Sequence, residues 1–213
     1  MKDMKNILNT DIYAITSEAH SLGRSNIEVA YDIIKSGVKV IQYREKDKHA
    51  REMYLECLKI REMTQANGVT FIINDHIDIA MLVGADGVHI GQDDLPAVDV
   101  RKLVGKDMII GLSTHSPEQA NNAIRSGVVD YIGVGPIYTT ETKTDVCKPV
   151  GIEYLKYVVD NLKIPFVAIG GIKEHNINEV KDAGAKLICL VTEIVGSRDI
   201  KRKIENLRAT IQR

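Results

Sequence analysis

The sequence has little of the residues that mark disulfide-rich, metal-thiolate or disordered proteins. Its 213 residues contain no tryptophan, two phenylalanines, five prolines and three cysteines. The cysteines are Cys57, Cys147 and Cys189, which are odd in number and never closely spaced. Neither a disulfide framework nor a thiolate metal site is therefore expected. We interpret Cys57 and Cys189 as small core residues.

An excess of charge and a long apolar run are also missing. Twenty-eight Lys and Arg residues against 29 Asp and Glu residues leave a formal net charge of −1, so nothing indicates binding to nucleic acid or to an anionic membrane. No run of about eighteen apolar residues occurs, and the start, MKDMKNILNTD, lacks the basic-then-apolar pattern of a secretory signal. We expect a cytoplasmic protein, and any anion that it binds must be held by local groups.

What the sequence does have is a recurring unit in which a helical stretch ends at a glycine and a β-rich run follows at once. Glycine suits the left-handed residue that closes a helix, and β-branched residues suit a strand that is buried on both faces. Five segments contain the unit: residues 36–41, 67–72, 83–88, 126–131 and 183–188. Residues 12–15, 108–112 and 164–169 add three further strand candidates.

Helical patterns lie between successive strand candidates. They cover residues 27–36, 50–66, 77–83, 97–104, 117–126, 152–161, 177–183 and 200–211. Strands that alternate with helices pair in parallel through right-handed crossovers. Eight such units, with no leftover strand, linker or second domain, predict an α/β fold: a closed (β/α)8 TIM barrel that forms a single domain over residues 1–213.

Polar residues that follow each strand are the candidates for an active site, because such barrels build it at the carboxyl ends of their strands. After the second strand, the alternation of side chains places Gln42, Arg44 and Lys46 on one side. It places Tyr43 and Glu45 on the other side. If the first three face the barrel mouth, they present an amide and two cations to an anion. A solvated strand end with surface salt bridges is the alternative.

Carboxylates follow the third and fourth strands. Asp75 comes after the third strand, and Asp93 and Asp94 come after the fourth. Carboxylates from adjacent strand ends can converge on magnesium, which takes one or two of them while substrate phosphates and water complete its shell. A magnesium diphosphate site is one interpretation. In the other, Asp75 caps the helix that starts near Ile77, and Asp93 or Asp94 caps the helix after Pro96.

A serine and a histidine, Ser113 and His115, follow the fifth strand. They suggest hydrolysis only weakly, because no glycine-flanked nucleophile elbow is present. Helix capping by Ser116 and contact with a phosphate explain this run better. His89 lies within the fourth strand and is expected to be buried with one ring nitrogen hydrogen-bonded. No histidines form a metal-ligand pair at helical spacing.

The last three strand ends offer a loop and a pair of glycines. The loop over residues 133–145 is long, polar and glycine-hinged, and its Lys143 can reach an anion if the loop closes. An exposed surface loop is the alternative. Gly170 and Gly171 let backbone amides approach a phosphate beside Thr192. A tight turn alone would also explain the two glycines.

In their order and spacing, these motifs resemble those of the thiamine phosphate synthase family. The matching stretches are Gln42-Tyr43-Arg44-Glu45-Lys46, Ile73-Asn74-Asp75, His89-Ile90-Gly91-Gln92-Asp93-Asp94, Gly111-Leu112-Ser113-Thr114-His115, Gly133-Val134-Gly135-Pro136, Thr140-Glu141-Thr142-Lys143 and Ala168-Ile169-Gly170-Gly171-Ile172. Each stretch is short, but jointly they cover almost the whole chain, so the resemblance is specific.

The resemblance implies an enzyme with a (β/α)8 barrel and two small-molecule substrates. It would join a hydroxymethylpyrimidine diphosphate to a hydroxyethylthiazole phosphate, releasing diphosphate and forming thiamine monophosphate. Implied for the pyrimidine diphosphate are Gln42, Arg44, Lys46, Asn74, Ser113 and Lys143, with Tyr43 and Glu45 from the same motif. Implied for the thiazole phosphate are Thr140, Thr142, Gly171, Val191 and Thr192, with Glu141 from the same loop.

The resemblance also implies magnesium on Asp75 and Asp94 and a dissociative route. The bond to diphosphate breaks first, and the thiazole nitrogen captures the pyrimidine carbocation. Arg44, Lys46, Ser113 and Lys143 are the implied catalytic residues. Magnesium and the three cations among them can neutralise the charge that develops on the diphosphate. Because the ring nitrogen carries no proton to remove, no general base is required.

Two positions depart from the usual sequence motifs of the family. Rival functions also stay open. Thr139 stands where a proline is common, and Thr192-Glu193 replaces a common Ser-Ala. Glu193 would repel a phosphate unless it points away or pairs with a cation. The rivals are a thiazole tautomerase paralogue, a phosphosugar epimerase or aldolase, and a non-catalytic sensor of thiamine precursors. The oligomeric state, including a homo-oligomer, stays open.

Overall fold

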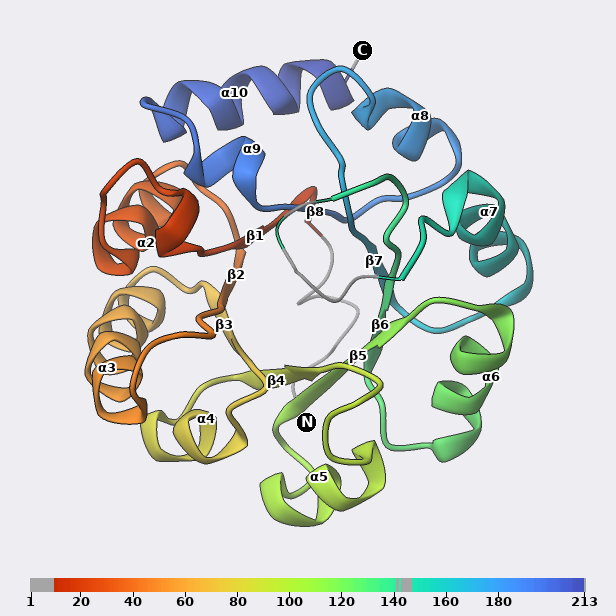
Figure 1. The fold of residues 1–213 in the computed structure, drawn as a ribbon, viewed down its shortest axis with the longest axis horizontal. Coiled ribbons are helices and arrows are strands. Elements are labelled where there is room, and N and C mark those ends of the chain that lie inside the picture. Colours follow the sequence, from red (N-terminus) through yellow and green to blue (C-terminus); the bar gives the residue numbers. More distant parts are fainter. Residues whose placement is uncertain (1–9, 141, 143–146, 213) are drawn as a thin grey trace.

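Eight parallel strands close into a barrel at the centre of the molecule (Figure 1). The structure is a computed structural model and describes residues 10–140, 142 and 147–212. The strands are β1 (Ile12–Ile15), β2 (Val40–Tyr43), β3 (Thr70–Asn74), β4 (Gly87–Ile90), β5 (Ile109–Thr114), β6 (Tyr131–Val134), β7 (Phe166–Ala168) and β8 (Ile188–Leu190). Strand β1 pairs in parallel with both β2 and β8, which closes the ring. The predicted (β/α)8 barrel is confirmed.

Helices surround the barrel and cover the outer face of every strand (Figure 1). They are α2 (Asn26–Lys35), α3 (Ala50–Ala66), α4 (Ile77–Val83), α5 (Ala97–Val104), α6 (Pro117–Ser126), α7 (Gly151–Asn161), α8 (Ile177–Asp182) and α10 (Ile200–Ile211). All eight were predicted to within a residue at each end. Two short helices, η1 (Glu18–His20) and α9 (Thr192–Val195), were not predicted.

The recurring glycine closes helices as expected, but the strand does not always follow at once. Gly84 and Gly127 take the left-handed conformation that ends α4 and α6, with φ of 62° and 65°. After each, a short turn precedes β4 or β6, and the turn ends in Asp86 or Asp130. Each of these carboxylates accepts a backbone N–H from a neighbouring strand, Phe71 for Asp86 and Ile110 for Asp130. The turns therefore join adjacent strands before the next strand begins.

Two apolar cores lie on the two sides of the strands. The larger core fills the space between barrel and helices and contains Ile41, Cys57 and Phe71. The smaller core lies inside the barrel and contains Tyr13 and Cys189. Burial of Cys57 and Cys189 confirms their interpretation as core residues. The inner core fills only part of the barrel, and it forms the floor of a cavity at the carboxyl ends of the strands.

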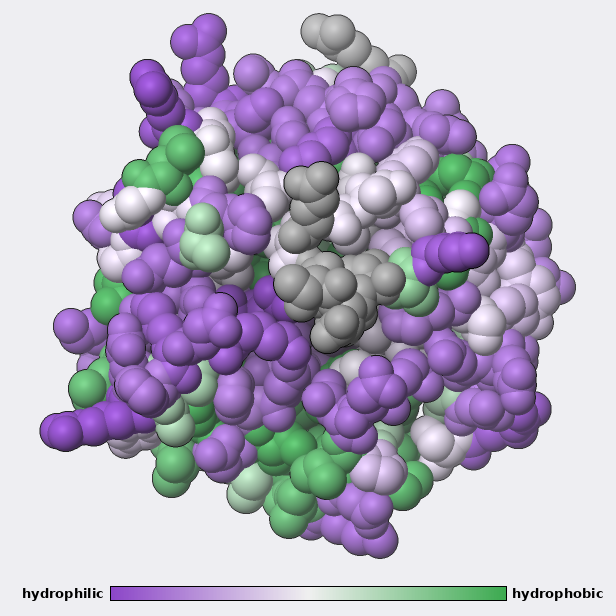
Figure 2. Space-filling view, in the orientation of Figure 1, coloured by the Kyte–Doolittle hydropathy of each residue, from purple (hydrophilic) through white to green (hydrophobic). Residues whose placement is uncertain are grey.

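The surface is mostly hydrophilic in the view along the barrel, and apolar side chains gather at its lower edge over α4 and α5 (Figure 2). The exposed apolar residues on and beside these helices are Met81, Leu82, Leu95, Val98 and Leu103. None of the helices formed by the described residues combines the length and the apolar character that a membrane crossing requires.

Candidate active site

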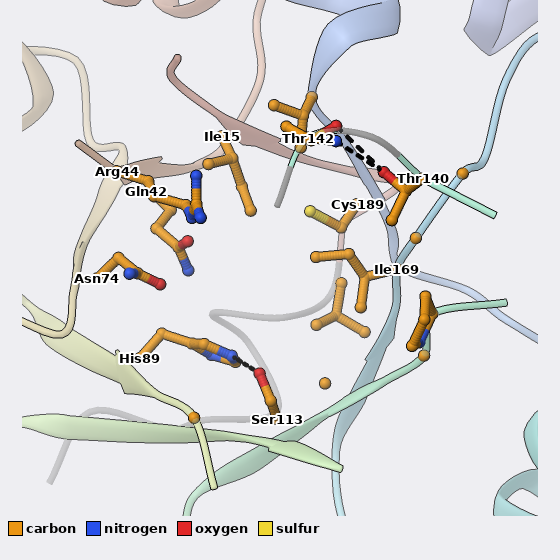
Figure 3. A pocket seen from close by; sticks show the side chains of 18 of the residues that line it. Ile15, Gln42, Arg44, Asn74, His89, Ser113, Thr140, Thr142, Ile169 and Cys189 are labelled. Carbon is orange, nitrogen blue, oxygen red and sulfur yellow. Dashed lines mark hydrogen bonds between the residues drawn. The ribbon is translucent and has the colours of Figure 1, made fainter. Parts of the chain in front are cut away.

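A large cavity is lined by residues at the carboxyl ends of all eight strands. Its volume is about 1040 Å³. Figure 3 shows Gln42, Arg44 and Asn74 on one side of this space and Ile169 and Cys189 on the other. In a barrel of parallel strands, this end is where catalytic groups are built. The cavity is large enough for two small ligands of the size that enzymes of metabolism bind.

The cavity gathers most of the residues that the sequence singled out. Those that line it are Gln42, Arg44, Lys46, Asn74, Asp75, Asp94, Ser113, Thr140, Thr142, Gly171, Val191 and Thr192. Two others, Tyr43 and Glu45, do not line it. Glu141 and Lys143 lie outside the described residues. The segment that ends β2 therefore has two faces, and only one of them belongs to the cavity.

The alternation of β2 places its amide and its cations in the cavity. Gln42 is 2% exposed, and its Nε2 donates to the Tyr13 hydroxyl at 2.8 Å. The backbone N–H of Arg44 donates to Thr16 Oγ1 at 3.3 Å, which ties the end of β2 to the end of β1. Arg44 and Lys46 follow on the same face and line the cavity. Lys46 does form a salt bridge, as the alternative of a solvated strand end expected, but its partner Asp75 also lines the cavity.

Tyr43 points away from the cavity, and this corrects its expected place beside the substrate. Its side chain packs in the outer core, and its hydroxyl donates to Glu56 Oε2 at 2.6 Å. Burial first, and then the hydrogen bond to Glu56, raise the pKa of Tyr43 far above its ordinary value. Tyr43 therefore stays a neutral donor that anchors β2 to α3.

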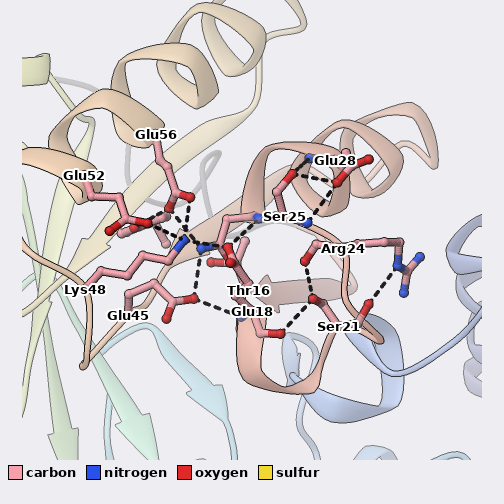
Figure 4. Close-up of polar contacts among 12 residues, drawn as sticks. Thr16, Glu18, Ser21, Arg24, Ser25, Glu28, Glu45, Lys48, Glu52 and Glu56 are labelled. Atoms are coloured by element: carbon pink, nitrogen blue, oxygen red, sulfur yellow. Dashed lines mark hydrogen bonds and ion pairs between the residues drawn. The ribbon is translucent and has the colours of Figure 1, made fainter.

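Glu45 also belongs to a polar cluster behind the cavity (Figure 4). Its Oε1 accepts hydrogen bonds from the Glu18 backbone N–H and from Asn26 Nδ2, both at 2.9 Å. Lys48 Nζ lies 2.5 Å from carboxylate oxygens of both Glu18 and Glu56. This cluster fixes the segment after β2 against α2 and α3. The expected contact of Glu45 with substrate is replaced by support for Arg44 and Lys46.

Two carboxylates and a lysine meet at the ends of β3 and β4. Lys46 Nζ lies 3.2 Å from Asp75 Oδ2. Burial first, and then the negative charge of Asp94, raise the pKa of Asp75, while Lys46 opposes this rise. Asp75 also has a left-handed φ of 61°, an uncommon conformation for a residue other than glycine. Strand ends thus hold two like charges close together.

Neither aspartate caps the helix that follows it, so the capping interpretation is wrong for both. The residue before α4 is His76 and the residue before α5 is Pro96, and neither helix start has a side-chain capping bond. Asp94 Oδ2 instead accepts the Gly91 backbone N–H at 2.6 Å. Ser116, by contrast, does cap α6, because its side chain accepts from the Gln119 backbone N–H.

The opposite wall of the cavity comes from β7 and β8. Gly171 has a φ of 66°, and a Cβ there would lie 2.4 Å from the Thr139 carbonyl oxygen, so only glycine fits. Lys173 Nζ donates to Thr192 Oγ1 at 2.6 Å. Glu193 pairs with Lys203 at 3.0 Å and with Lys173 at 3.6 Å. The acid beside the expected phosphate site is therefore neutralised by two cations.

Comparison with known proteins decides the family of this chain. The family model for thiamine monophosphate synthase matches residues 12–194. The chain belongs to the thiamine monophosphate synthase family. A thiamine-phosphate synthase of Pelotomaculum thermopropionicum is 66% identical over 212 residues, which are 100% of this chain and 97% of that protein. A thiamine-phosphate synthase of Lawsonia intracellularis is 55% identical and covers 96% of this chain and 94% of its own length.

A solved structure agrees with this assignment. Thiamine phosphate pyrophosphorylase from Pyrococcus furiosus superposes with a TM-score of 0.87 at 31% identity, covering 97% of this chain and 98% of its own. The similarity to the thiamine monophosphate synthase family thus extends from sequence to fold over the whole barrel. The chain is an enzyme of the transferase class that serves thiamine biosynthesis, as the sequence predicted.

Lys173 and Tyr13 are cavity residues of this thiamine monophosphate synthase family member that escaped the sequence analysis, whereas His89 was expected in β4 but with fewer hydrogen bonds. Lys173 lines the cavity, and its place in a polar run after β7 gave little signal. His89 was expected to have one bonded nitrogen, but both have partners: Nδ1 lies 2.9 Å from the Tyr131 hydroxyl and Nε2 lies 3.0 Å from Ser113 Oγ. Tyr13 joins them, with its hydroxyl 2.9 Å from that of Tyr131.

Proposed function

We propose that this enzyme joins a hydroxymethylpyrimidine diphosphate to a hydroxyethylthiazole phosphate, releasing diphosphate and forming thiamine monophosphate. The observation that carries the proposal is one cavity with Arg44 and Lys46 on one wall, Gly171, Lys173 and Thr192 on the other, and a carboxylate pair at the ends of β3 and β4. The 66% identical relative named thiamine-phosphate synthase supports the same reaction.

The pyrimidine diphosphate binds against the ends of β2, β3 and β5. Arg44 and Lys46 supply charge, and Asn74 and Ser113 supply polar groups that orient the ligand. Gln42 lies deeper in the barrel, beside the apolar floor, where it can meet the uncharged pyrimidine ring. Lys143, which lies outside the described residues, stays a predicted further cation for the diphosphate.

The carboxylate pair fits magnesium that is shared with a diphosphate. Asp75 and Asp94 are close enough that the charge of Asp94 raises the pKa of Asp75, and a divalent cation relieves that repulsion. No group of three or more His, Cys, Asp or Glu side chains with metal-binding geometry occurs within residues 10–140, 142 and 147–212. Two carboxylates suffice for magnesium when substrate phosphates and water complete its shell. When bound, magnesium would neutralise charge on the diphosphate.

The residues of this chain favour a dissociative step in which the carbon–oxygen bond to diphosphate breaks first. Negative charge then accumulates on the departing group, next to Arg44, Lys46 and Ser113. One preorganised donor of this kind typically contributes on the order of 100-fold in rate. The thiazole nitrogen captures the carbocation without losing a proton, so the enzyme needs no general base. The apolar floor around Ile15 and Ile169 keeps water from capturing it first.

The thiazole phosphate binds at the opposite wall. The Gly171 turn brings backbone close to the cavity, and the hydroxyls of Thr140 and Thr142, 3.1 Å apart, lie beside it. Val191 and Thr192 complete the wall at the end of β8. Lys173 adds a cation that is held between Thr192 and Glu193 and can turn to a phosphate. The substitution of Glu193 for a small residue is therefore compatible with a phosphate here.

The decisive experiment incubates the protein with both substrates and magnesium and follows the products by chromatography and mass spectrometry. We expect thiamine monophosphate and diphosphate in equal amounts, and none of either when one substrate is left out. Failure to form thiamine monophosphate from both substrates would refute the proposal. Rearrangement of the thiazole phosphate without the pyrimidine diphosphate would indicate an isomerase instead.

A further inference from the structure

A series of hydrogen-bonded polar side chains crosses the floor of the cavity, and its three middle members, Tyr13, Tyr131 and His89, take part in no step above. It runs from Gln42 through Tyr13, Tyr131 and His89 to Ser113. The four links measure 2.8, 2.9, 2.9 and 3.0 Å, so each is a good hydrogen bond. Figure 3 shows the last link, with the His89 ring turned toward Ser113. Side chains from β1, β2, β4, β5 and β6 are thereby connected in series.

The hydrogen bonds in this series all run in one direction, from Gln42 toward Ser113, because the amide nitrogen of Gln42 can only donate. Gln42 Nε2 carries hydrogens and has no lone pair to offer, so the Tyr13 oxygen accepts. Tyr13 has one proton, and Tyr131 is its other hydrogen-bond partner, so pairing that buried proton makes Tyr13 the donor to Tyr131. By the same count, Tyr131 donates to His89 Nδ1. An imidazole that accepts at Nδ1 carries its hydrogen on Nε2, from which it donates to Ser113 Oγ.

This direction decides what the Ser113 hydroxyl can do. Since Ser113 Oγ accepts from His89, it does not have to give its own proton to the imidazole. Within residues 10–140, 142 and 147–212, no other side-chain hydrogen bond of Ser113 Oγ is recorded, and Ser113 lines the cavity. Its proton is thus available to an anion in the cavity. The reverse direction would turn that proton toward His89 and present only lone pairs, which repel an anion.

The rings in the chain are held in place by glycines of the neighbouring strands. A Cβ on Gly111 of β5 would lie 2.2 Å from Cζ of Tyr131 and 2.5 Å from Nδ1 of His89. A Cβ on Gly133 of β6 would lie 3.3 Å from Cε1 of His89. The two rings therefore rest directly on backbone, where side chains would otherwise project into the barrel. Such close packing leaves His89 and Tyr131 little freedom to reorient.

We infer that Tyr13, Tyr131 and His89 are positioning residues that set the Ser113 hydroxyl as a hydrogen-bond donor to the departing diphosphate. The functional half of this inference rests on the proposed function, whereas the direction of the chain does not. A donor fixed before the reaction costs no reorganisation when charge develops on the leaving group. Gln42 is the origin of the direction, because its amide nitrogen is the group in the chain that cannot accept.

The first test measures the tautomer of His89 and needs no substrate. Protein labelled with 15N in its histidines is examined by two-dimensional NMR, and the His89 signals are assigned by their loss in His89→Gln. We expect the shift of an unprotonated, hydrogen-bonded Nδ1 and of a protonated Nε2. A neutral imidazole with its hydrogen on Nδ1 and none on Nε2 would overturn the inference, because Ser113 would then donate to His89 and not to the cavity.

The second test is a double-mutant cycle on Tyr131 and Ser113, measured as kcat/KM for the pyrimidine diphosphate. We expect Ser113→Ala to lose about 100-fold. We expect Tyr131→Phe to lose about tenfold when Ser113 is present, the order of one neutral hydrogen bond. In the Ser113→Ala background, Tyr131→Phe should lose less than about twofold, because it acts through Ser113. Tyr13→Phe, one link farther away, should lose less than Tyr131→Phe.

Tyr154→Phe is the matched control for this cycle. The Tyr154 hydroxyl is also buried and donates to Thr114 Oγ1 at 2.7 Å, but it lies on α7, outside the barrel. Its loss should leave kcat/KM within about twofold in both backgrounds, as expected for a structural hydrogen bond away from the site. An equal loss from Tyr131→Phe with and without Ser113 would overturn the inference. Inactivity of the unmodified enzyme would instead refute the proposed function and leave the tautomer measurement standing.

Discussion

The two ends of the barrel use aspartate in opposite ways. At the amino end, an aspartate just before a strand accepts a backbone N–H and pairs with an arginine from a helix. The pairs are Asp11 with Arg208 at 2.6 Å, Asp86 with Arg61 at 2.8 Å and Asp130 with Arg101 at 2.6 Å. Each of these carboxylates has a cation and an amide, so its charge is compensated within the fold.

At the carboxyl end, Asp75 has a poorer environment. Burial opposes ionisation of Asp11, but the hydrogen bond and the charge of Arg208 outweigh it, and the pKa of Asp11 is lowered. Burial and the charge of Asp94 together raise the pKa of Asp75 despite Lys46. The same residue type therefore stabilises the fold at one end and is left under strain at the other. A buried carboxylate whose charge is incompletely compensated, such as Asp75, is typical of a ligand-binding site, and here it lies at the carboxyl end of the barrel.

Of the changes that test this comparison of the two barrel ends, a substitution of Asp75 should have the largest effect, and the effect should be on turnover. Asp75→Asn keeps the size of the side chain, and asparagine tolerates the left-handed φ. It removes one of the two carboxylates proposed to hold magnesium, so kcat/KM should fall by roughly two orders of magnitude or more. Steady-state assays at saturating magnesium measure this.

The same variant should not weaken the fold. Removal of one of two repelling charges should leave the thermal midpoint at pH 7 unchanged or raise it, as calorimetry can show. Asp93→Asn is the control, because Asp93 is next to Asp94 in the sequence but is not one of the two proposed magnesium ligands. A variant of Asp75 that kept near-normal activity would contradict the metal role, and one that lost both activity and stability would make Asp75 a structural residue.

The next effect belongs to the amino end and falls on stability alone. The Asp86 side chain is 5% exposed and bonds Arg61 and the Phe71 backbone N–H. Asp86→Asn leaves Arg61 without its counter-ion, so the free energy of unfolding should fall by about 2 to 3 kcal/mol. Urea unfolding measures the loss. Asp99→Asn breaks the exposed pair with Lys102 and should change it by less than about 0.5 kcal/mol.

Activity separates this prediction from the first. With Asp86→Asn kept below its unfolding transition, kcat and both KM values should stay near those of the unmodified enzyme. Asp86 lies before β4, at the opposite end of the barrel from the cavity. A large fall in kcat at preserved stability would show that the two ends are not independent.

Much of the fold could be predicted from the sequence because its cause is local. A glycine such as Gly84 ends a helix by its own conformation, and a β-branched run such as Ile72–Ile73 favours a strand without help from distant residues. The short helix α9 was missed because four residues, Thr192–Val195, make no periodic pattern. The turn between Gly127 and β6 contains Asp130, which pairs with Arg101, 29 positions away in sequence, and no local pattern indicates such a contact.

The site was predictable in the same measure. Alternation along β2 was enough to separate Gln42 from Tyr43, yet Tyr43 was still expected to contact substrate because it stands within the family motif. The series of hydrogen bonds from Gln42 to Ser113 could not be predicted, since Tyr13 and Tyr131 are 118 positions apart and meet only when the barrel closes. A long-range contact of this kind has no signal in spacing or composition.

A smaller effect should distinguish the two walls of the cavity. Lys173→Met removes a cation from the proposed thiazole phosphate wall while keeping the bulk of the side chain. We expect KM for the thiazole phosphate to rise about tenfold, as for the loss of one charge-assisted hydrogen bond. KM for the pyrimidine diphosphate should not change. Lys203→Met, which removes the other partner of Glu193 away from the cavity, should raise KM for the thiazole phosphate less. Equal rises in both KM values would place Lys173 elsewhere in the reaction.

The smallest effect is a pH dependence that the ionisation of Asp75 predicts. Because its pKa is raised above 3.8 in the folded chain, Asp75 favours folding below that pH, and this contribution is lost as the pH rises through the raised pKa. At pH 7 the ionised Asp75 opposes folding, and magnesium at about ten times its Kd should raise the thermal midpoint by about 3 to 5 °C. The rise should shrink as the pH falls toward the pKa of Asp75, since a protonated carboxyl no longer ligates. Scanning calorimetry with and without magnesium measures it, and an undiminished rise in Asp75→Asn would show that magnesium binds somewhere other than the carboxylate pair.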